Sequence, residues 1–285
     1  MTTSRPVRRV AVVGIDGCGK SSVTARLRER SIFGGQVTTI SCPDFHHTVN
    51  GPLHELSRAL KAASDAADRV GNPVLKVAML YLRMTLYGPV ERFFLDTYEP
   101  DVLVCERHPL VETFVYAPLY AQLSQGVRRD RSALTEMFAL AEELEPGATV
   151  AVERWRHRHG RRVGTGSDVW TVIDEIVAAL DRGPAAALDT FAAAYRTALP
   201  DQVLWLDTAP TVAAGRCAER GGLETHESEA NLRKLRGLYS RVSTTLPGAF
   251  PDMSFERVAV GDDDTLEDVV GACIERVGLQ EIGMR

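Results

Sequence analysis

"GIDGCGKSS", Gly14 to Ser22, is the stretch that decides the fold of this 285-residue chain. It fits the pattern G-x-x-x-x-G-K-S, between an apolar β-branched run, "RRVAVV", and a helix-favouring run, "SSVTARLRER". In that setting the backbone N–H groups of the loop and helix N-terminus point at a phosphate, and the helix dipole favours the anion. The sequence therefore predicts a loop that binds the phosphates of a nucleoside triphosphate. Its expected contact residues are Gly14, Asp16, Gly17, Cys18, Gly19, Lys20, Ser21 and Ser22.

Three side chains of this loop carry specific expectations. Lys20 can reach the β- and γ-phosphates, and the Ser21 hydroxyl can ligate Mg²⁺. Asp16 is a carboxylate facing a phosphate site, and orienting a hydroxyl group or Mg²⁺ would explain its presence there. We therefore expect ATP and Mg²⁺ to be the ligands of the loop.

Apolar runs and helical patterns alternate along the rest of the chain. Four further runs predict buried strands, in residues 35–42, 101–107, 201–210 and 255–264. Helical patterns cover 52–97, the alanine-rich stretch after Pro184, and 265–278. This alternation predicts an α/β fold, a parallel five-stranded sheet flanked by helices, with ligands at the carboxyl ends of the strands.

No clear linker divides the chain, so we expect one domain over 1–285 with an inserted segment at about 117–200. Within that segment "GATVAVERW", residues 147–155, suggests an extra strand. Nearby lies a basic patch of five arginines, which are Arg154, Arg156, Arg158, Arg161 and Arg162. His157 and His159 in the patch are not read as a metal site, because no further ligands are close in sequence.

Composition excludes several classes of protein. A net charge of −5 argues against binding a nucleic acid polymer or an anionic membrane surface, which usually need a basic excess. The five cysteines are scattered without C-x-x-C spacing, which argues against a disulfide framework or a zinc site, and Cys105 is expected to be a buried thiol. No secretory signal and no membrane-length apolar run is visible, so a cytoplasmic location is expected.

The loop also carries a family resemblance. "VVGIDGCGKSS" resembles the first motif of thymidylate kinases, G-x-D-G-x-G-K-[ST]-[ST]. "VLVCERHP", residues 102–109, is similar to their D-R-[YH] motif and equally to the E-R-S motif of deoxynucleoside kinases. The resemblance implies a P-loop nucleoside or nucleotide kinase fold. It also implies that Glu106 sits near Mg²⁺ or the phosphoryl acceptor, and that Arg107 contacts the acceptor or the transferred phosphoryl group.

A later segment, "VLWLDTAPTVAAGRCAERGGLETHESEANLRKLRGLYSRV", is also similar to these kinases. They have a strand ending L-D-x-x-P, then a helix, an arginine-bearing lid and a second helix. The residues in register are Asp207, Pro210, Arg216, Arg220, Glu227, Arg236 and Tyr239. The resemblance implies a lid at about 216–230, in which Arg216 and Arg220 neutralise charge on the γ-phosphoryl oxygens. The last predicted strand and helix resemble the C-terminal strand and helix of these kinases and come in the same order.

Residues 43–83 are more loosely similar to the thymidylate kinases, and this similarity implies the acceptor site. Arg58 falls where the family holds the acceptor monophosphate, and Arg83 falls near the position of an arginine beside the acceptor base. Asp16 matches a carboxylate that contacts the acceptor sugar. Two expected arginines are missing, because Ser41 and Thr225 stand at their positions. Either the acceptor carries no phosphate, or the basic patch supplies replacement arginines for a bulkier phosphorylated acceptor.

These observations favour an ATP- and Mg²⁺-dependent kinase that acts on a nucleotide. The expected reaction is phosphorylation of a nucleoside monophosphate, as in the thymidylate kinases that the chain resembles. A kinase of a nucleoside or of a small hydroxylated metabolite is the nearest alternative. A regulatory P-loop ATPase, which hydrolyses ATP and signals to a protein partner, is the alternative from another class. The family resemblance further implies a homodimer.

Overall fold

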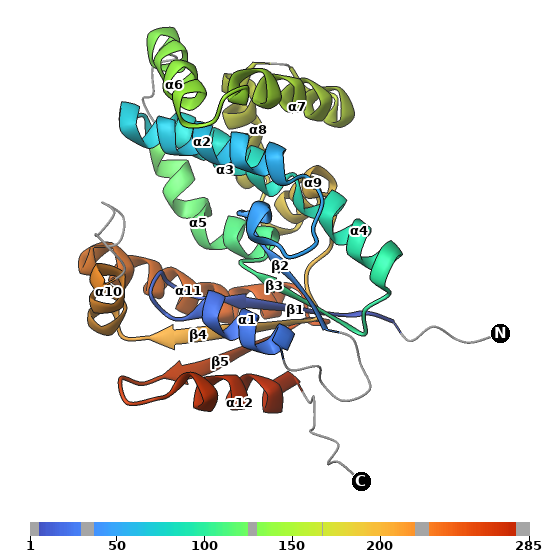
Figure 1. Ribbon diagram of the computed structural model, residues 1–285, viewed down its shortest axis with the longest axis vertical. Helices are drawn as coiled ribbons and strands as arrows, with labels where there is room; N and C mark the ends of the chain where they lie inside the picture. The colour runs from blue at the N-terminus through green and yellow to red at the C-terminus, as the bar shows by residue number, and fades with distance from the viewer. Residues whose placement is uncertain (1–5, 30–36, 125–129, 167, 220–227, 278–285) are drawn as a thin grey trace, which may run out of the picture. The chain divides into compact units, whose positions relative to one another are not determined.

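The five apolar runs form one parallel sheet in the order β2-β3-β1-β4-β5 (Figure 1). The computed structural model describes residues 6–29, 37–124, 130–166, 168–219 and 228–277. The strands are β1 (Arg8–Val13), β2 (Val37–Ser41), β3 (Val102–Glu106), β4 (Gln202–Thr208) and β5 (Ser254–Val260). The expected α/β class and the parallel five-stranded sheet are therefore confirmed.

Contacts divide the chain into two compact units, which we describe separately. The first unit comprises 1–40, 94–115 and 199–285, and the second comprises 41–93 and 116–198. Most of the expected insertion, 117–200, thus belongs to the second unit together with residues 41–93. The helices α4 (Tyr87–Tyr98) and α5 (Pro109–Ser124) begin in one unit and end in the other.

The first unit is built around the buried centre of the sheet. Val10 to Val13 of β1 are 0–1% exposed, because both faces of a parallel sheet are covered by helices. Two pairs of helices lie side by side, α1 with α12 and α10 with α11 (Figure 1). Their bounds are α1 (Lys20–Glu29), α10 (Pro210–Glu219), α11 (Glu229–Ala249) and α12 (Leu266–Val277).

Apart from the last residue of β2, the described residues of the second unit form helices and loops. The helices are η1 (Phe45–His47), α2 (His54–Val70), α3 (Pro73–Met84), α6 (Arg131–Leu144), α7 (Ala148–Val163), α8 (Val169–Asp181) and α9 (Pro184–Tyr195). The helical pattern over 52–97 is interrupted between α2 and α3. Gly71 ends α2 in a left-handed conformation, and the Asn72 side chain caps α3 ahead of Pro73.

The prediction of an extra strand at 147–155 is wrong, because this stretch begins α7. Its buried residues include Val152, Arg156 and His159, which recur at helical spacing. The alternating valines suggest a strand locally, but packing against α2 and α6 selects the helix.

Buried His159 makes the second unit sensitive to acid. Its ring contacts the Tyr81 hydroxyl at 3.2 Å and the Arg162 guanidinium at 2.9 Å. Burial, assisted by Arg162 and Arg196, lowers the pKa of His159 from 6.5 to about 4. Between pH 6.5 and about 4, His159 binds a proton in the unfolded chain but not in the folded one. The free energy of unfolding therefore falls as the pH falls through this range.

We expect the free energy of unfolding to fall by about 3 kcal/mol less on acidification in His159→Gln than in the wild type. Urea unfolding of both proteins at pH 7 and near pH 4 measures the difference. An equal loss of unfolding free energy in the two proteins would contradict the role of His159. Some acid sensitivity should persist in the variant, because burial lowers the pKa of His108 in the first unit to about 3.

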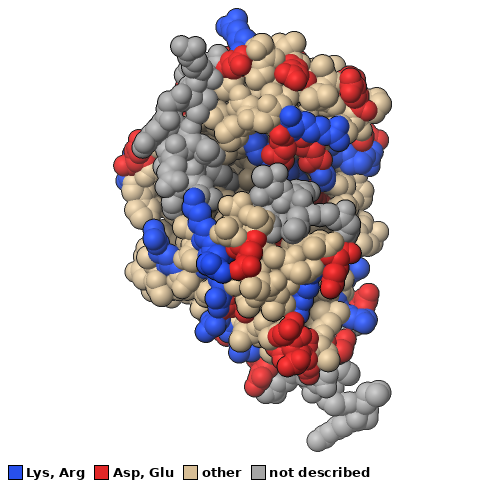
Figure 2. Space-filling view, turned by 90° about the vertical axis from the view of Figure 1, so that its left-hand side faces the viewer, with Lys and Arg blue, Asp and Glu red and all other residues tan. Residues whose placement is uncertain are grey.

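The cysteines, the surface charges and the helix lengths can each be compared with the sequence. All five cysteines are buried, which confirms the expected burial of Cys105. Acidic and basic side chains are interspersed on the face shown in Figure 2. No helix within the described ranges has the length and apolar character needed to cross a membrane.

Candidate functional site

The glycine-rich loop joins β1 to α1 and depends on glycine for its path. Gly14 has φ +146°, and a Cβ there would lie 2.6 Å from the Leu206 carbonyl oxygen of β4. Gly17 has φ +78°, and a Cβ there would collide with the Ala213 carbonyl of α10. Only glycine accommodates both the conformation and the contact at these two positions. The loop is thus packed closely over the carboxyl end of the sheet.

Lys20 is the first residue of α1 and is 5% exposed. Its ammonium group donates to the carbonyl oxygens of Gly14 at 3.0 Å and Ile15 at 2.8 Å. It also lies 3.7 Å from the Cys18 sulfur, a weak acceptor, and 4.0 Å from an Asp16 carboxylate oxygen. An ammonium group has three donors, so an anion at the loop can replace the sulfur contact without breaking the two carbonyl bonds.

Ser21 and Glu106 meet across the loop. Ser21 lies in the first turn of α1 and Glu106 ends the neighbouring strand β3, and the serine hydroxyl donates to Glu106 Oε1 at 2.7 Å. The structure thus brings together the two residues predicted as metal ligands. A hydroxyl oxygen and a carboxylate oxygen are hard donors of the kind that Mg²⁺ prefers.

Arg107 follows β3 in a left-handed conformation, with φ +58°. Its backbone N–H donates to the Val12 carbonyl at 3.0 Å, so its backbone is tied to β1. Its guanidinium is paired with Asp16 and lies 3.4 Å from Glu112 Oε2. A non-glycine residue in this conformation stores strain, of a kind that clusters at functional sites. The structure thus joins Arg107 to the loop through Asp16.

Glu112 belongs to this cluster, although the sequence analysis did not single it out. It is 2% exposed on α5 and accepts a hydrogen bond from the fully buried Tyr239 hydroxyl at 2.7 Å. Burial raises the pKa of Glu112, while Arg107 and the Tyr239 hydrogen bond oppose that rise. A lone glutamate inside the apolar run "PLVETFVYA" was the available signal.

Asp207 holds two arginines at the end of β4. Arg236 donates to its two carboxylate oxygens at 2.5 and 3.0 Å, and Arg257 donates at 2.6 Å. Burial raises the pKa of Asp207, but the hydrogen bonds from Arg236 and Arg257 outweigh it and lower the pKa. Arg236 therefore has a carboxylate partner within the first unit.

The predicted lid is only partly described. Arg216 lies half-buried on α10, without a hydrogen-bond or ion-pair partner among the described residues. Arg220 and Thr225 lie outside the described residues, as does Glu227.

The two predicted acceptor arginines lie in the second unit. Arg83 is 6% exposed, pairs with Asp44 at 2.6 Å and leaves its buried Nε without a hydrogen bond. Burial raises the pKa of Asp44, but Arg83 and nearby cations outweigh it and lower the pKa. Arg58 is half-exposed and pairs with Glu145 at 3.2 Å. The two arginines therefore have different carboxylate partners.

Comparison with models of known protein families and with curated protein sequences finds no match for this chain.

Proposed function

We propose that this protein is an ATP- and Mg²⁺-dependent phosphotransferase of the nucleotide-kinase type, phosphorylating a nucleoside monophosphate as the thymidylate kinases it resembles do. One observation carries the proposal. The glycine-rich loop places Lys20 and Ser21 at the start of α1, and the Ser21 hydroxyl meets Glu106 at the end of the adjacent strand. A phosphate-binding loop beside a carboxylate at the carboxyl end of a parallel sheet suits phosphoryl transfer.

The donor set beside the loop fits a magnesium ion. Ser21 Oγ and Glu106 Oε1 are 2.7 Å apart, so both oxygens can approach the same ion. When bound, Mg²⁺ would neutralise charge on the phosphates and orient them. Ser21 and Glu106 would hold it in place of their present hydrogen bond.

The remaining roles belong to the chain's own side chains. Loop amides and the Lys20 ammonium bind the phosphates of ATP. Asp16 holds Arg107, whose guanidinium orients the acceptor or the transferred phosphoryl group. Arg216 and Arg220 are proposed to add positive charge over the γ-phosphoryl oxygens. Arg58 and Arg83 are proposed to hold the acceptor.

The test is phosphoryl transfer from ATP with Mg²⁺ to a panel, with product masses read directly. The panel holds thymidine monophosphate, the other nucleoside monophosphates, free nucleosides and small hydroxylated metabolites. We expect a nucleoside monophosphate to be phosphorylated. Transfer only to unphosphorylated hydroxyl compounds would contradict the proposed acceptor class. ATP hydrolysis with no acceptor consumed would contradict the kinase itself and favour a regulatory ATPase.

Ser21→Ala should lower transfer and raise the Mg²⁺ concentration needed for half-maximal rate. Removing one ligand is expected to weaken metal binding by about 10–100-fold, since metal-site partners have effects of this size. A Mg²⁺ titration of the transfer rate measures this. Arg26→Ala, an exposed position later on the same helix, is the control and should keep the wild-type Mg²⁺ requirement. An unchanged Mg²⁺ requirement in Ser21→Ala would remove Ser21 from the metal site.

A further inference from the structure

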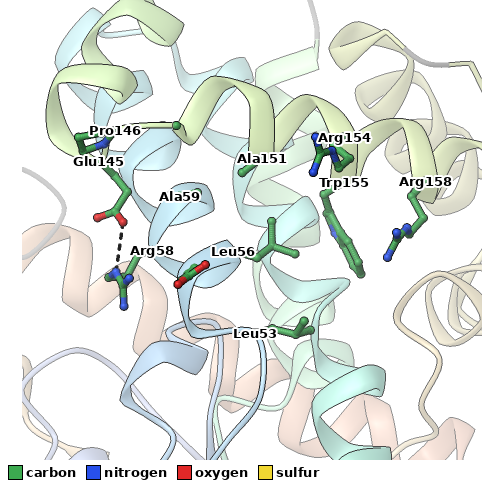
Figure 3. A pocket seen from close by; sticks show the side chains of 12 residues that line it. Leu53, Leu56, Arg58, Ala59, Glu145, Pro146, Ala151, Arg154, Trp155 and Arg158 are labelled. Atoms are coloured by element: carbon green, nitrogen blue, oxygen red, sulfur yellow. Dashed lines mark hydrogen bonds and ion pairs between the residues drawn. The ribbon is translucent and has the colours of Figure 1, made fainter.

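A pocket of about 510 Å³ lies wholly within the second unit (Figure 3). It is bounded by the start of α2, the connection between α6 and α7, and one face of α7. Its volume falls in the range of small-molecule sites, about 300–1,000 Å³. Leu53, Leu56, Ala59 and Ala151 contribute apolar surface to its lining. The pocket can therefore bury the apolar part of a small ligand.

Two arginines of the basic patch face this pocket without a carboxylate partner. Arg154 and Arg158 are exposed on α7, four residues apart, and each lacks a hydrogen-bond or ion-pair partner in the described part of the chain. Their Cα atoms are about 6 Å apart along the helix axis, and like charges at this spacing repel each other. The third arginine of the lining, Arg58, is already paired with Glu145 (Figure 3). Two guanidinium groups thus remain free to bind an anion.

The other arginines of the basic patch have different surroundings. Arg156 is 9% exposed, and Arg162 donates to the carbonyls of Ala193 at 2.9 Å and Ala194 at 2.6 Å. Arg161 is exposed and does not line the pocket. Helical geometry thus selects Arg154 and Arg158 from a patch that looks uniform in sequence.

Trp155 lies between these two arginines in sequence, and its side chain extends from α7 toward the leucines (Figure 3). Its indole N–H donates to the Thr85 hydroxyl at 2.8 Å, which fixes the orientation of the ring. A fixed indole offers a flat apolar surface to an aromatic ligand. Guanidinium groups beside it suit a phosphate, which each can bind through two parallel hydrogen bonds.

We infer that this pocket binds an organic phosphate monoester whose remaining part is a flat aromatic ring. Arg154 and Arg158 hold the phosphate, and Trp155 with the leucines contacts the ring. A dianionic phosphate matches two unpaired guanidinium groups better than a monoanionic carboxylate does. The inference does not require phosphoryl transfer at the glycine-rich loop.

The probe is phenyl phosphate, titrated into the full-length protein by calorimetry without ATP or Mg²⁺. We expect a Kd of about 1 mM or below, in keeping with the size of the ligand. Inorganic phosphate and benzoate should each bind at least about 10-fold more weakly, because each lacks one of the two recognised parts. If benzoate binds as tightly as phenyl phosphate, the inferred preference for phosphate is wrong. If inorganic phosphate binds as tightly, the inferred contact with an aromatic ring is wrong. No phenyl phosphate binding at about 10 mM would overturn the site, because a ligand this small is expected to bind below that concentration.

Variants assign the binding to these residues. Arg154→Ala with Arg158→Ala should weaken phenyl phosphate binding at least about 30-fold, because two charge-assisted contacts are lost. Arg161→Ala, an exposed arginine on the same helix, should bind as the wild type does. Binding of phenyl phosphate should change the fluorescence emission of the Trp155 indole, and Trp155→Phe should abolish that change. Full binding by the double variant would overturn the inference. Lys20→Met separates phosphate binding at the loop from binding at the pocket. Binding that Lys20→Met keeps and the double variant loses belongs to the pocket, so failure of this site and failure of the proposed kinase are distinguishable.

Discussion

Lys20→Met is expected to lower phosphoryl transfer by about 10²–10³-fold, the usual effect of removing one charge-stabilising donor from a reacting group. Methionine keeps the apolar stem of a side chain that is 5% exposed, and it removes only the ammonium group. Transfer rates with saturating acceptor measure the effect. Because the Gly14 and Ile15 carbonyls lose their donor, a stability loss of about 1–3 kcal/mol should accompany it.

Arg26→Ala is the matched control for this variant. Arg26 is a cation on the same helix, half-exposed and paired with Glu29 and Glu267, away from the loop. It should transfer phosphate at the wild-type rate, since surface ion pairs contribute little. A folded Lys20→Met protein that transfers phosphate normally would refute the assignment of the loop as the donor site.

Glu112→Ala is expected to lower both stability and transfer. Its removal takes the Glu112 acceptor away from the buried Tyr239 hydroxyl and the Glu112 carboxylate away from Arg107, at a cost of about 2–4 kcal/mol. We expect kcat/KM to fall about 10–100-fold, because Arg107 loses one of the partners that orient it. Glu112 acts here as a positioning residue, through Arg107. Urea unfolding and steady-state kinetics measure the two effects.

Glu112→Gln separates the two consequences. Its amide oxygen can still accept from Tyr239, so most of the stability should return, while its neutral amide no longer attracts Arg107. Transfer should therefore stay low in a stable protein. Tyr239→Phe is the complementary control, expected to cost about 1 kcal/mol of stability and little transfer. Wild-type kinetics in Glu112→Gln would show that the carboxylate does not position Arg107.

The proposed transfer site and the pocket share Arg58, which lines the pocket and is proposed to hold the acceptor, but their other residues differ. The glycine-rich loop and its carboxylate belong to the first unit, and the pocket with Arg154 and Arg158 belongs to the second. Each can be tested with variants that leave the other intact. If phenyl phosphate binds and the transfer panel fails, the second unit would be a ligand-binding module on a protein of another activity.

The strands of the sheet and the glycine-rich loop can be read from local sequence. Buried parallel strands are short continuous apolar runs, and that signal is local. The glycine positions of the loop are also local in origin, because Gly17 must adopt φ +78° within its own turn. Lys20, Ser21 and Glu106 could therefore be named in advance, since motif spacing and strand ends mark them.

The partners of the buried charges and the course of the inserted segment depend on tertiary packing. Residues 147–155 alternate like a strand, yet packing on α2 and α6 makes them part of a helix. Glu112 and Tyr239 are 127 residues apart, so no local pattern reveals their hydrogen bond. The five arginines of the basic patch look equivalent in sequence. They differ because a helix of 3.6 residues per turn turns Arg156 inward and leaves Arg154 and Arg158 at the pocket.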